Sequence, residues 1–149
     1  MTKENQFSTF YLDGLYFGVE VEQVQEVLRY HELTSVPLAP FTVSGLINLR
    51  GKVVAAMDLR RRLNMKDREK DKLPMNVVVR TNNGVVSLLV DKIGDVLNVK
   101  GDTFETPPDN IDETTRELIK GIYKLKDQLL LILDTQEATS IATTDVSSN

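Results

Sequence analysis

The chain has 149 residues, the size of one domain or of two very small ones packed together. Hydrophobic residues make up 41% and charged residues 27%, which is typical of a globular chain with its own core and excludes a disordered one. The net charge of −4 disfavours general nucleic-acid binding, and the absence of cysteine excludes disulfides, thiol nucleophiles and cysteine-ligated metals.

The chain is predicted to open with a β-hairpin. Two aromatic-rich runs, Phe7 to Leu12 and Leu15 to Val19, flank Asp13-Gly14, a pair typical of a two-residue hairpin turn. Between Val21 and Leu28, apolar residues recur at helical spacing with Glu and Gln between them. This pattern predicts one or two turns of amphipathic helix.

Two further strands and a charged linker follow. The strands are predicted over Leu46 to Arg50 and Lys52 to Leu59, and Asp58 is placed to cap a brief helical turn over Arg60 to Leu63. The run Lys66 to Lys72 alternates in charge at every residue and has no apolar face, so it is predicted to be solvated. We therefore expect the boundary between two subdomains near residues 66–73.

The second half repeats the strand pattern. Asn76 to Thr81 and Val85 to Val90 flank Asn82-Asn83-Gly84, whose Asn-Gly pair suits a tight hairpin. The remaining strands are predicted over Ile93 to Val99, Ile122 to Leu125 and Leu129 to Asp134. Short strands with little helix indicate an all-β fold, with two small barrels sharing one interface. Residues 139–149 are predicted to form a flexible polar tail.

No sequence feature indicates export or membrane insertion. The longest apolar runs, such as Val53 to Met57 and Leu129 to Leu133, are far shorter than the roughly twenty residues that cross a bilayer. Met1 to Gln6 is polar and lacks the apolar stretch of a signal peptide. We therefore expect a cytoplasmic protein.

No recognisable catalytic, metal or cofactor motif is present. The glycines are scattered singly and form no phosphate-binding loop. His31 lacks a nucleophilic serine pattern nearby. The carboxylates between Glu20 and Glu26, and the pair Asp91 and Asp95, lack the spacing of a metal site, so we interpret both as solvated. The sequence predicts a protein that is not an enzyme and that binds no cofactor or metal.

The charge is unevenly distributed. Residues 49–72 hold nine Lys or Arg against four Asp or Glu. The run Arg60-Arg61-Arg62 could contact nucleic acid, but no aromatic residues are interleaved for base stacking and the rest of the chain is acidic. A basic segment on an acidic protein favours docking to another protein, where complementary charge sets orientation and association rate.

The motif Gly45-Leu46-Ile47-Asn48-Leu49-Arg50-Gly51, followed by Asp58-Leu59-Arg60, resembles the signature of the CheW-like adaptor family of bacterial chemotaxis. Val24-Gln25-Glu26-Val27 and Val90-Asp91 match in the same order, and the resemblance covers residues 6–138. It implies two five-stranded SH3-like β-barrels packed around a shared hydrophobic core. It also implies a scaffold that couples methyl-accepting chemoreceptors to the histidine kinase CheA.

The resemblance also implies roles for individual residues. Those expected to face the receptor are Glu26, Val27, Arg50, Ile93 and Val96, and those expected to face the regulatory domain of the kinase are Val24 and Gly45. Each has a structural alternative. The three apolar receptor residues also suit a barrel core, and Arg50 could form a local ion pair.

Structural alternatives also remain for the neighbouring residues of the motif. Asn48 is expected to bond backbone at a turn. Gly45 and Gly51 are explained equally by a positive φ angle or by the close approach of a partner.

The resulting hypothesis is a cytoplasmic adaptor that receptor arrays recruit to the inner face of the membrane. It would bridge kinase and receptor and so raise their effective concentration. One alternative is a CheW-like adaptor of another chemosensory pathway, such as pilus or gliding motility. From other classes, a small β-barrel nucleic-acid binder would use Arg60 to Arg62, and a small hydrolase would depend on His31.

Overall fold

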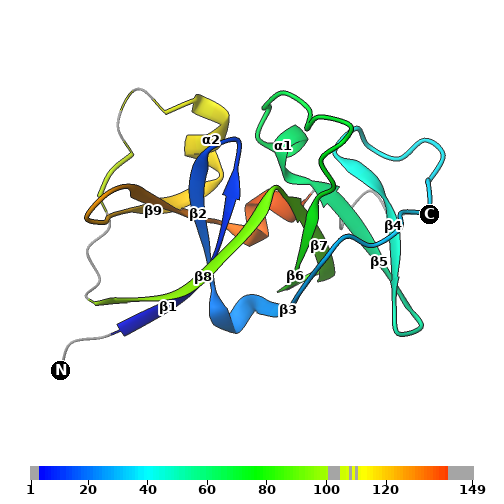
Figure 1. The fold of residues 1–149 in the computed structure, drawn as a ribbon, viewed down its shortest axis with the longest axis horizontal. Helices are drawn as coiled ribbons and strands as arrows, with labels where there is room; N and C mark the ends of the chain where they lie inside the picture. Colours follow the sequence, from blue (N-terminus) through cyan, green and yellow to red (C-terminus); the bar gives the residue numbers. More distant parts are fainter. Residues whose placement is uncertain (1–3, 101–104, 108, 110, 141–149) are drawn as a thin grey trace.

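The structure, a computed structural model, describes residues 4–100, 105–107, 109 and 111–140. Ten strands account for most of this part of the chain (Figure 1). They are β1 (Glu4–Leu12), β2 (Leu15–Glu20), β3 (Val24–Leu28), β4 (Val43–Leu49), β5 (Lys52–Asp58), β6 (Met75–Thr81), β7 (Gly84–Val90), β8 (Lys92–Lys100), β9 (Ile119–Lys124) and β10 (Leu129–Leu133). The helical elements are η1 (Val21–Gln23), α1 (Leu59–Arg62), α2 (Glu113–Glu117) and a segment over residues 135–140.

The strands form two five-stranded sheets, which confirms the all-β prediction. Sheet A has the order β8-β1-β2-β10-β9, and sheet B has the order β3-β6-β7-β5-β4. Within the described residues, no strand pairing joins the first and last strands of either sheet, so both barrels are open. The two sheets lie side by side in Figure 1, with residues 135–140 between them.

The predicted boundary near residues 66–73 is wrong. That segment lies between α1 and β6 and therefore inside sheet B, whose strands β3 to β7 are contiguous in the chain. The chain passes between the sheets at η1 and again at Asp91, the single residue between β7 and β8. The charged run suggested a linker because it has no apolar face, whereas the real crossings are one 3-10 turn and one residue.

A shared core between the sheets is confirmed. Phe10 and Phe17 from sheet A stack with ring centroids 5.7 Å apart, and they pack in one cluster with Val77 and Leu88 from sheet B. A second cluster lies within sheet B, around Ile47. Consecutive residues of β6 and β7 serve different clusters, which explains why these strands have continuous apolar sequences instead of alternating ones.

The predicted helix over residues 21–28 is wrong. Val21–Gln23 forms one 3-10 turn, and Val24–Leu28 is strand β3, paired with β6. A register shift between Val24 and Glu26 marks a β-bulge, so Val24 and Val27 lie opposite Val79 and Val77 on the same face of the sheet. The bulge thus produces the three-residue spacing that imitates a helix.

The predicted hairpins are confirmed, the second with a different turn. The first turns at Asp13-Gly14, as predicted, and the second turns at Asn82-Asn83, one residue before the predicted Asn-Gly pair; Gly84 is the first residue of β7 and has a φ of 126°. The Asp58 side chain caps α1 by accepting a hydrogen bond from the backbone N–H of Arg60 at 3.0 Å. In the expected tail, Thr139 is buried and donates to the Thr135 carbonyl, and residues 141–149 lie outside the described part.

Candidate functional site: an apolar margin and an adjacent ion pair

Strands β3 and β8 are edge strands of their sheets, and both present apolar side chains toward the space between the sheets. In β3, Val24 and Val27 lie on the face that carries the shared core. In β8, Ile93 is paired with Phe10 and Val96 with Ser8, which places them on the corresponding face of sheet A. We call these four residues, Val24, Val27, Ile93 and Val96, the apolar margin.

The turn η1, which leads into β3, contacts both sheets. The turn η1 lies against both β1, the neighbour of β8, and β6, the neighbour of β3. Val24 and Ile93 pack against the shared core, while Val27 is 38% and Val96 59% exposed. Ile93 is therefore part of the core, the structural alternative to a receptor contact. Val27 and Val96 are exposed enough to contact a partner.

Arg50 and Glu26 are brought together although they are 24 residues apart. The two guanidinium nitrogens of Arg50 donate to the two carboxylate oxygens of Glu26, one of them at 3.0 Å. The hydrogen bonds from Arg50 outweigh partial burial and hold the pKa of Glu26 below its usual value. The ion pair joins the β4–β5 turn to β3, the opposite edge strand of sheet B.

The ion pair lies on the other side of β3 from the apolar margin. Glu26 is paired with Val78, which belongs to the cluster inside sheet B, whereas Val27 is paired with Val77 of the shared core. The five residues expected to face the receptor are therefore divided between the two sides of β3. Strand β3 presents an apolar side chain to one face and a charged side chain to the other.

Local geometry explains the turn that carries Arg50. Arg50 and Gly51 have φ angles of 51° and 88°, the left-handed pair of a two-residue hairpin turn. The Asn48 side chain accepts a hydrogen bond from the Gly51 N–H at 2.9 Å, which confirms its structural role. A Cβ on Gly51 would meet nothing within 4 Å, so the φ angle and not a crowded neighbour favours glycine.

Gly45 is explained by the chain's own backbone. A Cβ at this position would lie 2.6 Å from the carbonyl oxygen of Thr34, and its φ is 155°. Thr34 and Leu46 exchange two backbone hydrogen bonds of 2.8 Å beside it. Gly45 is buried on β4, and Val24 lies on β3, the opposite edge strand of sheet B.

The predicted basic surface is largely neutralised within the molecule. Arg60 pairs with Asp91, with one nitrogen–oxygen distance of 2.6 Å, and Arg61 pairs with Asp67 at 3.1 Å. Arg62 donates to the carbonyl oxygens of residues 137 and 138. The three guanidinium groups that nucleic-acid binding would require are therefore engaged in holding the fold.

Asp91 is the centre of this network, so the interpretation of its carboxylate as solvated is wrong. Its carboxylate accepts hydrogen bonds from Arg60, from Arg68 at 2.9 Å and from the Asp13 backbone N–H at 2.8 Å. The side chains of Arg60 and Arg68 are only 11% and 9% exposed. Asp91 thus ties the β1–β2 turn, α1 and the charged loop to the point where the chain crosses between sheets.

Sequence reasoning missed an exposed apolar loop between β3 and β4. Leu38 is fully exposed with a φ of 63°, and Phe41 is 69% exposed. The guanidinium carbon of Arg61 lies 4.4 Å from the centre of the Phe41 ring, and Arg61 also donates to the Phe41 carbonyl at 3.2 Å. The available signal was a pair of large apolar residues beside two prolines, in the run Pro37-Leu38-Ala39-Pro40-Phe41.

A model of the CheW-like domain matches residues 6–142. The chain belongs to the CheW-like domain family. It is 30% identical to the chemotaxis protein CheW of Bacillus subtilis over 125 residues, covering 84% of this chain and 80% of that protein. It is 26% identical to CheW of Klebsiella aerogenes over 139 residues, 93% of this chain and 84% of that protein.

A solved structure and a more distant relative extend the comparison. The crystal structure of the scaffolding protein TtCheW from Thermoanaerobacter tengcongensis matches with a TM-score of 0.80 at 26% identity. The match covers 91% of this chain and 88% of TtCheW. Protein FrzA of Myxococcus xanthus is 39% identical over 61 residues, 41% of this chain and 38% of FrzA. The CheW-like fold therefore extends over nearly the whole chain.

The described residues contain neither a metal-binding cluster nor a membrane-spanning helix. No group of three or more His, Cys, Asp or Glu side chains is placed to hold a metal ion. None of the helices in the same residues is long and apolar enough to span a membrane.

Proposed function

We propose that this chain is a chemotaxis adaptor without enzymatic activity, which couples methyl-accepting chemoreceptors to the regulatory domain of a CheA-type histidine kinase. The observation that carries the proposal is the CheW-like match over residues 6–142, together with named chemotaxis relatives of similar length. An adaptor of this kind works in the cytoplasm and is recruited to the inner face of the membrane by receptor arrays. It requires two binding surfaces and no reactive group.

For the receptor we propose the apolar margin and the neighbouring Arg50–Glu26 ion pair. Val27 and Val96 offer exposed apolar surface of the kind that seats the apolar face of a helix. Arg50 is 69% exposed although it is paired, so it can donate to an acceptor on the receptor. An exposed ion pair contributes little to folding stability, which leaves its charges available for recognition.

For the kinase we propose the loop that carries Leu38 and Phe41. It belongs to sheet B and joins the edge strands β3 and β4, so it offers a second surface apart from the margin. Gly45 supports this assignment indirectly. A larger residue there would displace Thr34 at the base of the loop. Val24 packs beside Val27 in the margin, so we group it with the receptor residues.

The decisive experiment measures CheA autophosphorylation in membranes that contain the cognate receptor. We expect the wild-type protein to raise the flux in an attractant-sensitive way, and Arg50→Glu to abolish this effect while kinase binding is kept. The matched control is Lys52→Glu, the same charge reversal two residues away on an exposed side chain. Equal loss in both variants would contradict a specific role for Arg50.

A charge swap separates recognition from folding. The double variant Glu26→Arg with Arg50→Glu re-forms the ion pair with its charges exchanged. If the pair only supports the fold, the swap restores coupling. If the receptor recognises Arg50 itself, the swap stays inactive although the protein is folded, which is the result we expect.

A second candidate function is an adaptor in another chemosensory pathway. Its support is the similarity to FrzA, at 39% identity over 61 residues. Two reconstitutions distinguish these functions. One uses the receptor and kinase encoded beside the gene, and the other uses the receptor and kinase of a known chemotaxis pathway from another organism. Coupling only with the neighbouring set, where that set serves pilus or gliding motility, would favour this candidate.

A further inference from the structure

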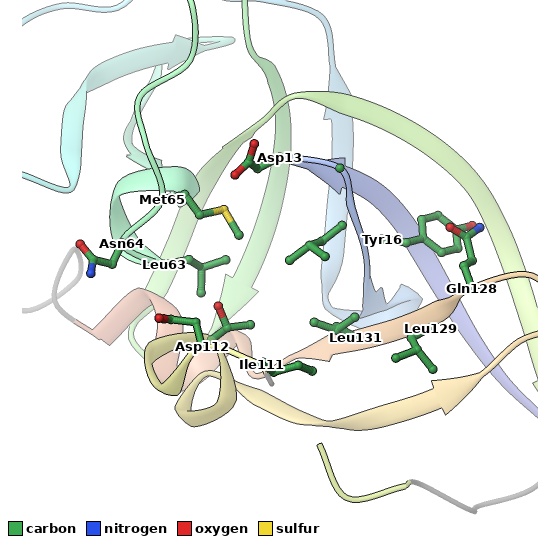
Figure 2. A pocket seen from close by; sticks show the side chains of 13 residues that line it. Asp13, Tyr16, Leu63, Asn64, Met65, Ile111, Asp112, Gln128, Leu129 and Leu131 are labelled. Atoms are coloured by element: carbon green, nitrogen blue, oxygen red, sulfur yellow. The ribbon is translucent and has the colours of Figure 1, made fainter. Parts of the chain in front are cut away.

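A cavity of about 580 Å³ opens between sheet A and the helical turns on one side of the molecule. Its walls come from the β1–β2 turn, the residues after α1, the start of α2 and strand β10 (Figure 2). This volume is within the range of small-molecule sites. None of the four margin residues lines it, so it is a different site from the proposed receptor surface.

The cavity has an apolar floor that is continuous with the shared core. Leu63 and Leu131 are core residues, 1% and 3% exposed, and they line the cavity. Met65, Ile111 and Leu129 pack partly buried around them. The methionine side chain is flexible, so this surface can pack against apolar groups of different shapes. An alkyl chain or a single aromatic ring would replace water against it.

Among the described residues that line the cavity, the charged side chains are Asp13 and Asp112, both acidic. Asp13 and Asp112 lie on opposite sides of the opening, and the other polar residues of the lining, such as Asn64 and Gln128, are neutral (Figure 2). Asp13 is partly offset by Arg60, whose nitrogen lies 3.7 Å away. Asp112 accepts only a backbone N–H, from Thr114, among the contacts of the described residues. The electrostatic field in the cavity therefore favours a cation.

We propose that this cavity binds a small amine that carries an apolar tail, with its ammonium group at Asp112 and its tail over Leu63 and Leu131. Apolar burial supplies most of the affinity, and the carboxylate selects the charge of the head group. The ligand would contact sheet A and, through Leu63, the segment that follows α1 and leads to sheet B. Binding would therefore hold the two sheets in one arrangement and raise the melting temperature.

The test uses three probes of six carbon atoms each, with a cationic, a neutral and an anionic head group: n-hexylamine, hexanol and hexanoate. Each is titrated into the full chain, and methyl NMR signals of leucine, isoleucine and methionine residues are followed at neutral pH. We expect saturable shifts at Met65, Ile111 and Leu129, with the amine binding roughly tenfold tighter than hexanoate. Equal binding of amine and hexanoate, or shifts that do not saturate, would overturn the proposal.

Two variants locate the selecting charge. Asp112→Asn keeps the helix cap, because asparagine caps helices as well as aspartate does, but it removes the charge. We expect it to bring the affinity for the amine down to that for hexanol. Asp109→Asn is the control, since this fully exposed carboxylate does not line the cavity. A loss of selectivity in both variants, or in neither, would contradict the assignment to Asp112.

Discussion

Replacing Asp91 by asparagine is expected to destabilise the fold strongly. The substitution keeps the shape of the side chain but removes the charge that two nearly buried guanidinium groups share. Breaking a buried ion pair by neutralising one partner costs about 3 to 5 kcal/mol. Asp91 is still 21% exposed, so we expect the lower end, about 3 kcal/mol of unfolding free energy.

Urea denaturation followed by circular dichroism measures this cost, since the chain has no tryptophan to report by fluorescence. The matched control is Asp67→Asn, which removes the partner of Arg61 at an exposed site. We expect the control to leave the midpoint almost unchanged, because exposed ion pairs contribute little. Equal, small losses in both variants would refute the inference that Asp91 anchors the crossing between the sheets.

The same carboxylate makes stability depend on pH. Burial alone would raise the pKa of Asp91, but the hydrogen bonds from Arg60, the Asp13 backbone and Arg68 outweigh it and keep the pKa below the usual 3.8. Because the folded-state pKa is the lower one, Asp91 stabilises the fold above pH 3.8, and this stabilisation is lost as the pH falls below 3.8. The stability difference between wild type and Asp91→Asn should therefore shrink in acid, and a growing difference would contradict this account.

Three other substitutions test the turns and the buried polar pair by the same denaturation assay. Gly45→Ala should cost about 3 kcal/mol, because its Cβ would clash with the Thr34 backbone in addition to the φ strain. Gly51→Ala should cost only about 1 to 2 kcal/mol, since φ strain acts alone there; an equal cost would show that the clash is relieved. Asn76→Ala should cost about 2 to 4 kcal/mol by leaving the Ser87 hydroxyl unpaired in the core, and adding Ser87→Ala should recover part of it. No recovery would mean that the hydroxyl finds another partner.

Features set by neighbouring residues were predictable from the sequence. The hairpin at Asp13-Gly14, the hairpin just before Gly84 and the Asp58 cap follow from residues a few positions apart, and all three were predicted. Helix α2, which was not predicted, has only five residues, and its Asp112 cap is a weak signal by itself. Short helices of this kind depend on the tertiary contacts around them.

Features set by distant contacts were not predictable. The bulge in β3 and the division of strands between sheets depend on the pairing of β3 with β6 and of β1 with β8, which local patterns do not record. Arg50 and Glu26 were each selected by resemblance, but their mutual ion pair depends on the curvature of sheet B. The exposure of Leu38 likewise depends on how its loop leaves the sheet, and apolar character alone did not predict it.

The strands of sheet B are contiguous in the chain, and the strands of sheet A come before and after them. This order affects how the chain folds during synthesis. Every strand of sheet B has been made once residue 90 is translated, whereas sheet A also needs β10, which ends at residue 133. The β1–β2 hairpin is therefore synthesised first and remains without its sheet while sheet B forms. During this time Phe10 and Phe17 lack most of their core contacts. Sheet B is thus placed to serve as the template on which the β1–β2 hairpin meets β9 and β10, and removing β10 would leave β2 without one of its two neighbouring strands.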